Sequence, residues 1–247
     1  MTEDALTSVE DLGLPVGPPL RLEEPGRCLE VLGPFLQAER IERLREVLAR
    51  RTRHVTVLAE RLHDEHNIAA CVRSCEAFGI QDLHLVPQED LRKKRKMSIM
   101  VSTGSHKWLS MRRHATSTEA VQHLRAQGYR IVVADPPGDH PSTPVGALCL
   151  DQPLALVVGN EREGVSPQVR ALADERVHAP MAGFVESLNV SVACAVLLCQ
   201  IRARLDRDLG SAALMSAADQ TRLLDLWVAR DVPRVGEVVT ELIRRAP

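Results

Sequence analysis

Aromatic residues are scarce in this chain of 247 residues, which has three Phe, two Trp and one Tyr. Base stacking on aromatic rings therefore cannot dominate any contact with nucleic acid. No apolar run approaches the length of a membrane span. The acidic start Met1-Thr2-Glu3-Asp4 lacks the basic region and the apolar stretch of a signal peptide, so we expect a cytoplasmic protein.

Cysteine pairs of the metal-binding type are missing as well, because no two of the six cysteines form a Cys-x-x-Cys pair. The six are Cys28, Cys71, Cys75, Cys149, Cys194 and Cys199. Four of them fall in two expected helices, next to apolar residues. We therefore expect buried free thiols in a reducing compartment rather than disulfides or metal ligands, and no bound metal.

A strong net charge is also absent, but the charge is unevenly distributed. The chain carries −2 overall, whereas residues 1–30 carry −5, so the remainder carries +3. Eight Lys or Arg and no acid occur in residues 91–113. A solvated surface loop and a phosphate-binding segment both fit such a run, and composition does not decide between them.

The ends of the chain differ from its middle. Residues 1–37 hold prolines, glycines and acids without a hydrophobic period, which predicts a mostly flexible tail. In residues 38–51 an apolar stripe at helical spacing is surrounded by arginines, which predicts a basic amphipathic helix. One main domain is expected at 38–208, followed by a helical extension at 209–247 that Pro233 interrupts.

The main domain alternates apolar strands with helices. Expected strands cover residues 54–59, 83–86, 130–134, 154–158 and 176–179, and expected helices cover residues 67–78, 118–127, 166–173 and 188–205. This alternation predicts an α/β fold with a mostly parallel sheet and helices on both faces.

Three loops carry candidate chemistry, and the first follows the first strand. Asn67 is a suitable N-cap for the helix that begins there. Arg73 lies in the second turn among apolar neighbours, where an arginine is costly unless it is paired. Its partner is either a buried acid of the protein or a bound anion.

The second loop, residues 159–166, follows a strongly apolar strand. Gly159 and Gly164 flank polar residues, and Ser166 is placed to cap the next helix. Glycines at a strand end allow close backbone approach to a ligand, although a plain turn would use them too. The spacing fits neither a dinucleotide fingerprint nor a triphosphate-binding loop.

The third loop, residues 183–191, opens the longest apolar helix. Ser187 and Asn189 could each cap it, yet Glu186 and Ser191 crowd the same helix start. Several polar groups at a buried helix start indicate a bound polar ligand.

Taken together, in this order and spacing, the three loops resemble the sequence motifs of the SpoU/TrmH branch of the SPOUT RNA methyltransferases. The resemblance runs from about Ala38 to Leu205. Arg43 to Arg51 is also similar to the N-terminal helix of the tRNA (guanosine-18) 2′-O-methyltransferases in that branch. The resemblance implies a C-terminal deep trefoil knot, S-adenosylmethionine as the cofactor, and a homodimer with its active site at the subunit interface.

The resemblance also assigns roles to particular residues. It implies that S-adenosylmethionine is held, largely through backbone groups, by Ala134, Gly159, Asn160, Gly164, Ala179, Met181 and Leu188. It places Arg73, Asn67, Glu161, Ser187 and Asn189 around the methyl group and the attacking 2′-hydroxyl. Arg73 either removes the proton of that hydroxyl or stabilises the alkoxide, and the second role suits a guanidinium better.

A tRNA phosphate surface follows from the same resemblance. It comprises Arg40, Arg43, Arg50 and Arg51, the run Arg92, Lys93, Lys94, Arg95 and Lys96, and Arg202 with Arg204. We expect 2′-O-methylation of a tRNA ribose, at guanosine 18 of the D-loop. A ribosomal RNA or another tRNA position is the alternative substrate, and a non-catalytic RNA-binding protein is the alternative class.

Overall fold

The structure, a computed structural model, describes residues 12–14, 17–88, 104–138, 140–160 and 162–246. The chain forms two compact units, and each is described by itself. One unit comprises residues 52–213, and the other comprises residues 1–51 together with 214–247.

Residues 52–213 contain a seven-stranded sheet in which neighbouring strands run parallel to one another. Its strands are β1 (Val55–Glu60), β2 (Asp82–Val86), β3 (Ser110–Arg113), β4 (Arg130–Ala134), β5 (Thr143–Pro144), β6 (Leu154–Val158) and β7 (Glu175–His178). They lie side by side in the order β3-β2-β1-β6-β4-β7-β5. The expected parallel α/β sheet is confirmed.

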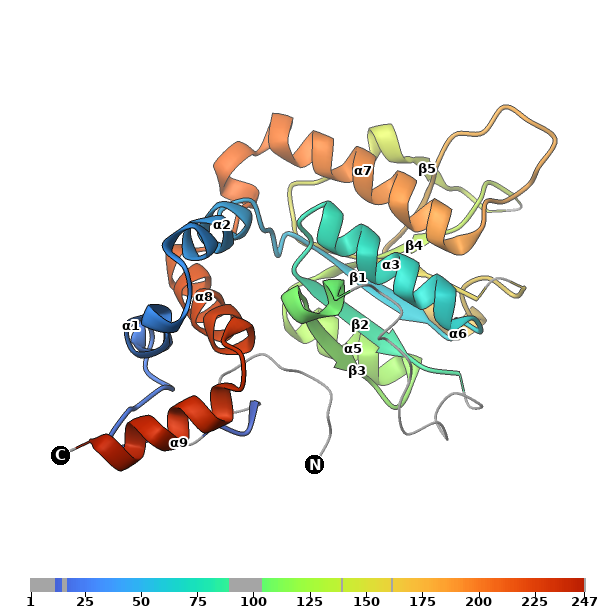
Figure 1. Cartoon of the computed structure of the whole chain (residues 1–247). Coiled ribbons are helices and arrows are strands. Elements are labelled where there is room, and N and C mark those ends of the chain that lie inside the picture. Colours follow the sequence, from blue (N-terminus) through green and yellow to red (C-terminus); the bar gives the residue numbers. More distant parts are fainter. Residues whose placement is uncertain (1–11, 15–16, 89–103, 139, 161, 247) are drawn as a thin grey trace. The chain divides into compact units, whose positions relative to one another are not determined.

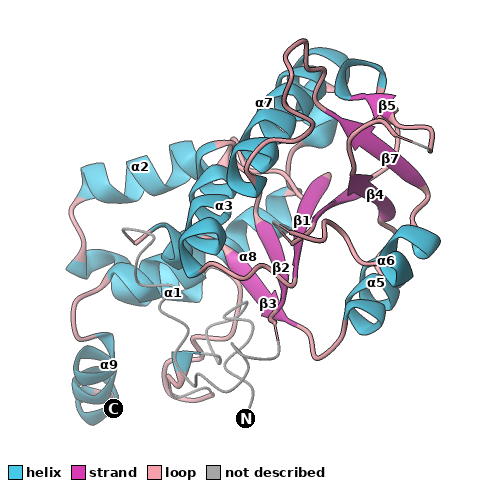
Figure 2. Ribbon diagram, turned by 90° about the vertical axis from the view of Figure 1, so that its right-hand side faces the viewer, coloured by secondary structure: helices cyan, strands magenta, loops and turns pink. Residues whose placement is uncertain are grey.

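Helices cover both faces of this sheet, as Figure 2 shows. Helices α3 (Glu65–Ala77) and α7 (Val190–Asp208) pack on one face, and α5 (Ser117–Ala126) and α6 (Pro167–Leu172) pack on the other. Short 3₁₀ turns are η4 (Ser105–Trp108), η5 (Val145–Ala147) and η6 (Gly210–Ala213). The central strand β1 shows why both faces must be covered: Val57 joins the α3/α7 core, and Leu58 joins the α5/α6 core.

Helix starts follow the capping rules, with one correction. Ser166 caps α6, as predicted, and of the two candidates Ser187 and Asn189 it is Asn189 that caps α7. Asn67 does not cap α3, because that helix begins two residues earlier and the Asp64 carboxylate accepts the His66 amide hydrogen bond at 2.8 Å. Asn67 therefore lies within the first turn, where its side chain is available for other contacts.

The two strands that the sequence pattern missed are polar or very short. Strand β3 has the sequence Ser-Met-Arg-Arg and lies at one edge of the sheet, where only one side is paired. Strand β5 is two residues long, ends in Pro144 and lies at the other edge. Edge strands need no apolar alternation and tolerate proline, so neither produces the expected signal.

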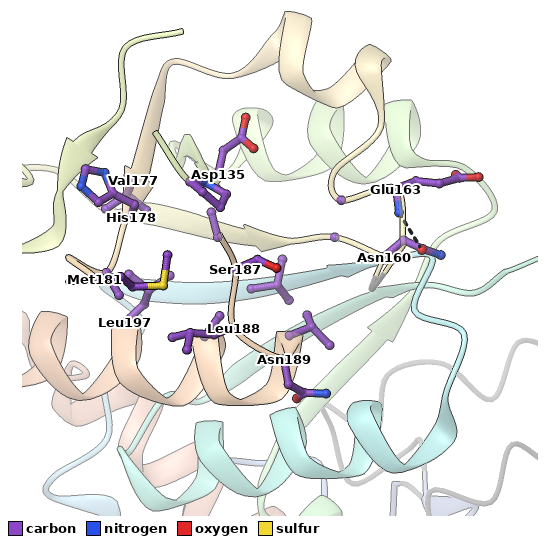
Figure 3. Close-up of a pocket in the computed structure, with 18 of the residues that line it drawn as sticks. Asp135, Asn160, Glu163, Val177, His178, Met181, Ser187, Leu188, Asn189 and Leu197 are labelled. Atoms are coloured by element: carbon purple, nitrogen blue, oxygen red, sulfur yellow. Dashed lines mark hydrogen bonds between the residues drawn. The ribbon is translucent and has the colours of Figure 1, made fainter. Parts of the chain in front are cut away.

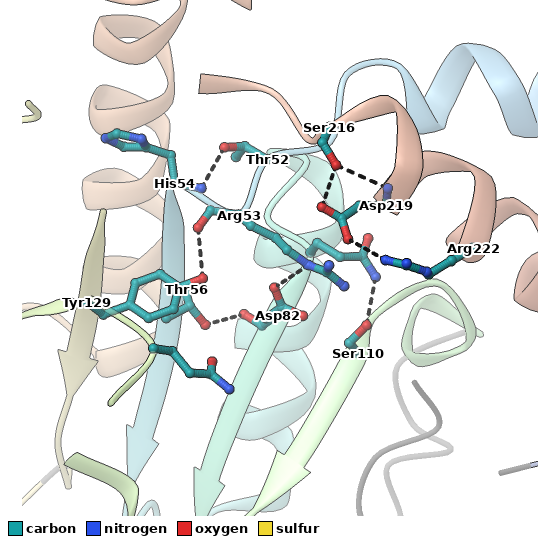
Figure 4. A network of polar contacts seen from close by, with 12 residues as sticks. Thr52, Arg53, His54, Thr56, Asp82, Ser110, Tyr129, Ser216, Asp219 and Arg222 are labelled. Carbon is teal, nitrogen blue, oxygen red and sulfur yellow. Dashed lines mark hydrogen bonds and ion pairs between the residues drawn. The ribbon is translucent and has the colours of Figure 1, made fainter. Parts of the chain in front are cut away.

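A polar network holds the amino-terminal edge of the sheet (Figure 4). The Thr56 hydroxyl donates to the main-chain oxygen of Asp82 at 2.8 Å, and the Asp82 carboxylate accepts from the Arg53 guanidinium at 3.0 Å. The Tyr129 hydroxyl donates to the Arg53 carbonyl oxygen, and burial raises the pKa of this tyrosine. These groups satisfy one another, so this edge has a structural role.

The second unit is helical and contains α1 (Arg27–Leu32), η2 (Gly33–Phe35), α2 (Ala38–Leu48), α8 (Ala217–Asp231) and α9 (Val235–Arg245). Figure 1 traces these elements at both ends of the chain. Helix α1 lies inside the segment 1–37 for which the sequence predicts a flexible tail. The buried Asp225 carboxylate explains the difference, since it accepts the Leu29 amide at 2.9 Å and the Gly26 amide at 2.5 Å, and so caps α1 from α8.

Arg51 belongs to the core of this helical unit. It is completely buried, and its guanidinium lies 5.3 Å from the centroid of the Trp227 ring. The expectation that Arg51 binds an RNA phosphate is therefore wrong, because the side chain has no surface to offer.

The cysteines are free thiols, but two of them are not buried. Cys149 and Cys199 are exposed, and the other four are buried. A hydrogen bond with Cys71 and burial hold the pKa of Cys194 well above its usual value, so that thiol stays protonated. None of the helices described in the structure has the length and hydropathy needed to cross a bilayer.

Candidate active site

A pocket of about 340 Å³ lies at the carboxyl ends of β4, β6 and β7, beside the start of α7 (Figure 3). Its lining includes Ala134, Asp135, Gly159, Asn160, Gly164, Arg170, His178, Ala179, Met181, Ser187, Leu188, Asn189 and Leu197. The carboxyl edge of a parallel sheet is where ligands of open α/β folds bind. A second cavity of about 740 Å³ shares Asp135, His178 and Ser187 with the first.

The loop after β6 forms one wall of the pocket. Gly159 cannot carry a side chain, since a Cβ there would lie 2.2 Å from the Val165 nitrogen. Asn160 organises the rest of the loop: its side-chain oxygen accepts from the Arg162 and Glu163 amides at 2.8 and 3.2 Å, and its backbone pairs with Gly164. The side chain of Asn160 is thus already used within the protein.

The segment before α7 forms the opposite wall. Ser187 and Leu188 line the pocket, and Asn189 caps the helix by accepting from the Ser191 amide at 2.9 Å. The other end of the Asn189 amide donates to the side-chain oxygen of Asn67 at 3.3 Å. The first and third sequence loops therefore meet beside the pocket.

Most of the predicted site residues come together in this structure. All seven residues expected to hold a cofactor line the pocket, and so do Ser187 and Asn189. Asn67 reaches the same place through Asn189. Two residues of the expected reaction centre remain, Glu161 and Arg73. Glu161 lies outside the described residues.

Arg73 is not brought to this pocket. It lies on α3 six residues after Asn67, and six residues of helix rotate the side chain to a different face of the helix. It is exposed rather than enclosed by apolar neighbours, so burial does not require an anion there. Arg73 therefore cannot be assigned to a substrate in this pocket from the geometry of one chain alone.

The expected RNA contacts are only partly available. Arg40 is held by both oxygens of Asp231 at 2.6 and 3.0 Å, and that carboxylate raises the pKa of Arg40. Arg43 is exposed and pairs with Glu46 at 2.9 Å, a weak surface contact, and Arg50 is exposed. The run Arg92 to Lys96 lies outside the described residues.

Two arginines of α7 have structural roles instead. Arg204 donates to the carbonyl oxygens of Val145 and Leu148 at 2.9 and 2.6 Å. Arg202 pairs with Asp206 at 2.8 Å, and only 14% of its side chain is exposed. The expectation that Arg202 and Arg204 extend an RNA surface is therefore wrong.

The sequence argument missed the polar pocket residues that lie outside the three loops, Asp135, Arg170 and His178, and assigned no role to Arg162 and Glu163 of the second loop. The Asp135 carboxylate accepts from Arg170 at 3.1 Å, and His178 contacts the Ser142 hydroxyl at 3.0 Å. The only available signal was position, since two of them end or follow strands at the carboxyl edge of the sheet.

The pocket fits an organic ligand better than a metal. Its volume is within the usual range for ligand pockets, roughly 300–1,000 Å³. Apolar side chains of Met181, Leu188 and Leu197 lie beside main-chain and polar groups, a combination that suits a nucleoside with an aliphatic arm. Within the part of the chain that the structure describes, no three His, Cys, Asp or Glu side chains are grouped to hold a metal ion.

A parallel α/β domain with a ligand-sized pocket at the carboxyl edge of its sheet is an architecture that many cofactor-dependent enzymes share. Residues 54–199 match the model of the SpoU rRNA Methylase family. The chain belongs to this family of methyltransferases.

The curated relatives agree with the family match. The chain is 33% identical to the tRNA (guanosine(18)-2′-O)-methyltransferase of Aquifex aeolicus over 78% of this chain and 90% of that protein. It is 32% identical to the Escherichia coli enzyme of the same name over 75% of this chain and 80% of that protein.

Solved structures resemble the fold as well. The A. aeolicus TrmH/SpoU tRNA modifying enzyme superimposes with a TM-score of 0.69 at 31% identity and covers 79% of this chain and 98% of its own. The SpoU methyltransferase AviRb from Streptomyces viridochromogenes, in complex with the cofactor AdoMet, gives 0.55 at 28% identity over 64% of this chain and 63% of its own.

Proposed function

We propose that this protein transfers a methyl group from S-adenosylmethionine to the ribose 2′-hydroxyl of guanosine 18 in tRNA. The observation that carries the proposal is the pocket, which gathers all seven residues expected to hold the cofactor. The names of the A. aeolicus and E. coli relatives supply the substrate. This activity belongs in the cytoplasm, where tRNA is modified.

S-adenosylmethionine would be held between the two pocket walls. Main-chain groups at Gly159, Ala179 and Leu188 would bind it, and Met181 and Leu197 would pack against its apolar parts, since all five residues line the pocket. The cofactor supplies an activated methyl group on a sulfonium, so positioning is most of what the protein must add.

The reacting hydroxyl lies at the Ser187–Asn189 end of the pocket. Ser187 and Asn189 line it and can orient the 2′-oxygen by hydrogen bonds, and Asn67 holds the Asn189 amide in place. Arg73 stabilises the developing alkoxide and the neighbouring phosphate. Since Arg73 does not line the pocket of its own chain, it would act on the pocket of a second copy.

A homodimer follows from this division of the site. Helix α7 carries an exposed stripe that includes Val192 (47% exposed) and Cys199. The preceding loop adds the exposed side chains of Phe184 and Val185. Apolar groups in such number beside one pocket suit an interface with a second copy of this chain.

We place the deep trefoil knot in the same region. Residues 159, 160 and 162–164 line the same pocket as residues 179, 181 and 187–189, although a helix and a strand separate the two sets in sequence. A chain end passed through a loop would bring two such segments together, and few folds allow this.

The RNA surface includes Arg43 and Arg50 of the expected basic helix, which are exposed. The run Arg92 to Lys96, which lies outside the described residues, is retained from the sequence. Contacts of this kind fix the position of RNA by its phosphates. Residues 1–37 and 209–247 are additions to the methyltransferase domain in this view.

One observation favours a second substrate. The matching family model is described as a family of rRNA methylases, so ribosomal RNA is the alternative to tRNA with the same chemistry.

The test uses purified protein, S-adenosylmethionine and tRNA transcripts. We expect 2′-O-methylguanosine at position 18 after nuclease digestion and mass spectrometry, and no product from a transcript with 2′-deoxyguanosine at that position. Methylation of ribosomal RNA but not of tRNA would move the assignment to the alternative substrate, and no transfer to either would refute it.

A further inference from the structure

A buried carboxylate at the end of β1 touches the second pocket loop from behind. Glu60 is 1% exposed, and its two oxygens accept hydrogen bonds from the Ser166 amide at 2.8 Å and the Ser166 hydroxyl at 2.5 Å. Among the described residues no cation is paired with it. A buried carboxylate costs free energy unless its hydrogen bonds are made, so Ser166 must keep its position relative to Glu60.

The next residue holds the other end of the same loop. Arg61 has φ of 54°, which lies in the left-handed region. This conformation is unfavourable for any residue that carries a side chain. Its amide donates to the Val86 carbonyl oxygen at 2.8 Å, and its own carbonyl oxygen accepts from the Asn160 side chain at 2.9 Å. The unusual backbone thus turns one carbonyl toward Asn160.

Two consecutive residues therefore fasten the loop at both ends. Asn160 and Ser166 bracket the segment whose glycines, with Arg162 and Glu163, form one wall of the pocket. Glu60 is the last residue of β1 and Arg61 follows it, and both reach the loop because β1 pairs directly with β6, with Ala59 opposite Val158.

We propose that Glu60 is a positioning residue for the pocket, which fixes the 159–166 loop in its ligand-binding conformation through Ser166. The inference rests on the proposed function, since S-adenosylmethionine is the ligand of that pocket. Glu60 does not touch the ligand: it reduces the number of loop conformations, and a ligand that binds an ordered loop loses less entropy.

The test measures the affinity of the full-length protein for S-adenosylhomocysteine by isothermal titration calorimetry. Glu60→Ala removes both hydrogen bonds, and we expect Kd to rise about tenfold or more, as for lost hydrogen bonds to a charged group. Glu60→Gln keeps the shape and can still accept from the Ser166 amide and donate to its hydroxyl, so it should restore most of the affinity.

Thr56→Val is the matched control. It removes a buried hydrogen bond from the same strand, but at the amino edge, where Thr56 contacts Asp82 (Figure 4). We expect a lower melting temperature with unchanged Kd. Amide hydrogen exchange of residues 162–169 supplies the second readout, and it should accelerate in Glu60→Ala but not in Thr56→Val.

The outcomes separate the two claims. Folded Glu60→Ala with wild-type Kd and exchange overturns the positioning role and leaves the proposed function standing. An equal loss of affinity in Thr56→Val overturns it too, because the effect would then be general destabilisation. A wild-type protein that does not bind S-adenosylhomocysteine would refute the cofactor, and with it both claims.

Discussion

The side-chain amide of Asn189 joins α7 to α3, because its oxygen and its nitrogen make different hydrogen bonds. Its oxygen accepts from the Ser191 amide at 2.9 Å, which leaves its nitrogen directed at the oxygen of Asn67, 3.3 Å away and 122 positions earlier in the chain. The cap of α7 therefore dictates which group faces α3. A residue that caps the helix is thus also one that lines the pocket and connects it to Asn67.

Substitutions of Asn189 separate its role as the cap of α7 from its hydrogen bond to Asn67. Asn189→Asp keeps a capping oxygen but loses the donor to Asn67, so the free energy of unfolding should change by less than about 0.5 kcal/mol while methyl transfer falls. Asn189→Ala loses the cap as well and should cost about 1 kcal/mol. Urea unfolding and initial rates check both. Equal stability loss in the two variants would contradict the capping role.

Arg73→Ala should abolish methyl transfer and leave the Kd for S-adenosylhomocysteine unchanged, because Arg73 does not line the pocket of its own chain. A mixture of Arg73→Ala with the pocket variant Ser187→Ala adds a test of the dimer. Random exchange of subunits in equal amounts should restore about a quarter of the wild-type activity, since half of the dimers then carry one intact site. Persistent inactivity after subunit exchange would place Arg73 and the pocket in the same chain.

Gly159→Ala and Gly183→Ala form a matched pair. A Cβ at Gly159 would overlap the backbone of Gly164 and Val165, at distances from 2.2 to 2.5 Å, whereas a Cβ at Gly183 meets nothing within 4 Å. We expect Gly159→Ala to lose S-adenosylhomocysteine binding and to lower the melting temperature, and Gly183→Ala to keep both. Calorimetry and thermal unfolding provide the measurements, and normal binding by Gly159→Ala would show that the loop has room to move.

Acid should destabilise the sheet through a cluster of three histidines: His84 on β2, His114 directly after β3, and His123 on α5. Burial and the neighbouring His114 lower the pKa of His84 to about 3. Below about pH 6.5 the unfolded chain binds a proton at this site that the folded protein excludes, so stability should fall as pH drops toward 3, by up to about 1.4 kcal/mol per pH unit.

His84→Gln tests that cluster. His84 Nδ1 lies 2.9 Å from His114 Nε2, so the variant should be less stable at pH 7 but should lose less stability on acidification. The free energy of unfolding at several pH values between 7 and 4 gives both slopes. Identical slopes would exclude His84 as the source of the acid sensitivity.

The fold was most predictable where burial is complete. Strands β4 and β6 begin and end at the predicted residues because apolar runs there face helices on both sides. Edge strand β3 carried no such pattern, since one side of it is unpaired. The cap of α3 was misplaced because Asp64 and Asn67 are both suitable and only the fold decides between them.

The seven residues expected to hold the cofactor assembled in one pocket, whereas Arg73 of the first loop did not join them. Only part of the predicted arginine surface is exposed. The fate of an arginine depends on partners far along the chain: Arg51 lies against Trp227, and Arg204 lies against carbonyls near Val145. No local pattern around either arginine reveals these partners.

The position of β1 in the sheet determines when each of its two edges can be paired during synthesis. Val57 pairs with Leu83 on one side and with Leu156 on the other. The first neighbour emerges from the ribosome soon after β1, and the second emerges only when most of the domain has been made. During that interval β1 exposes an unpaired edge rich in valine, which is the kind of surface that recruits other chains. Translation speed through residues 87–153 and access to chaperones should therefore limit the yield of folded protein more than its final stability does.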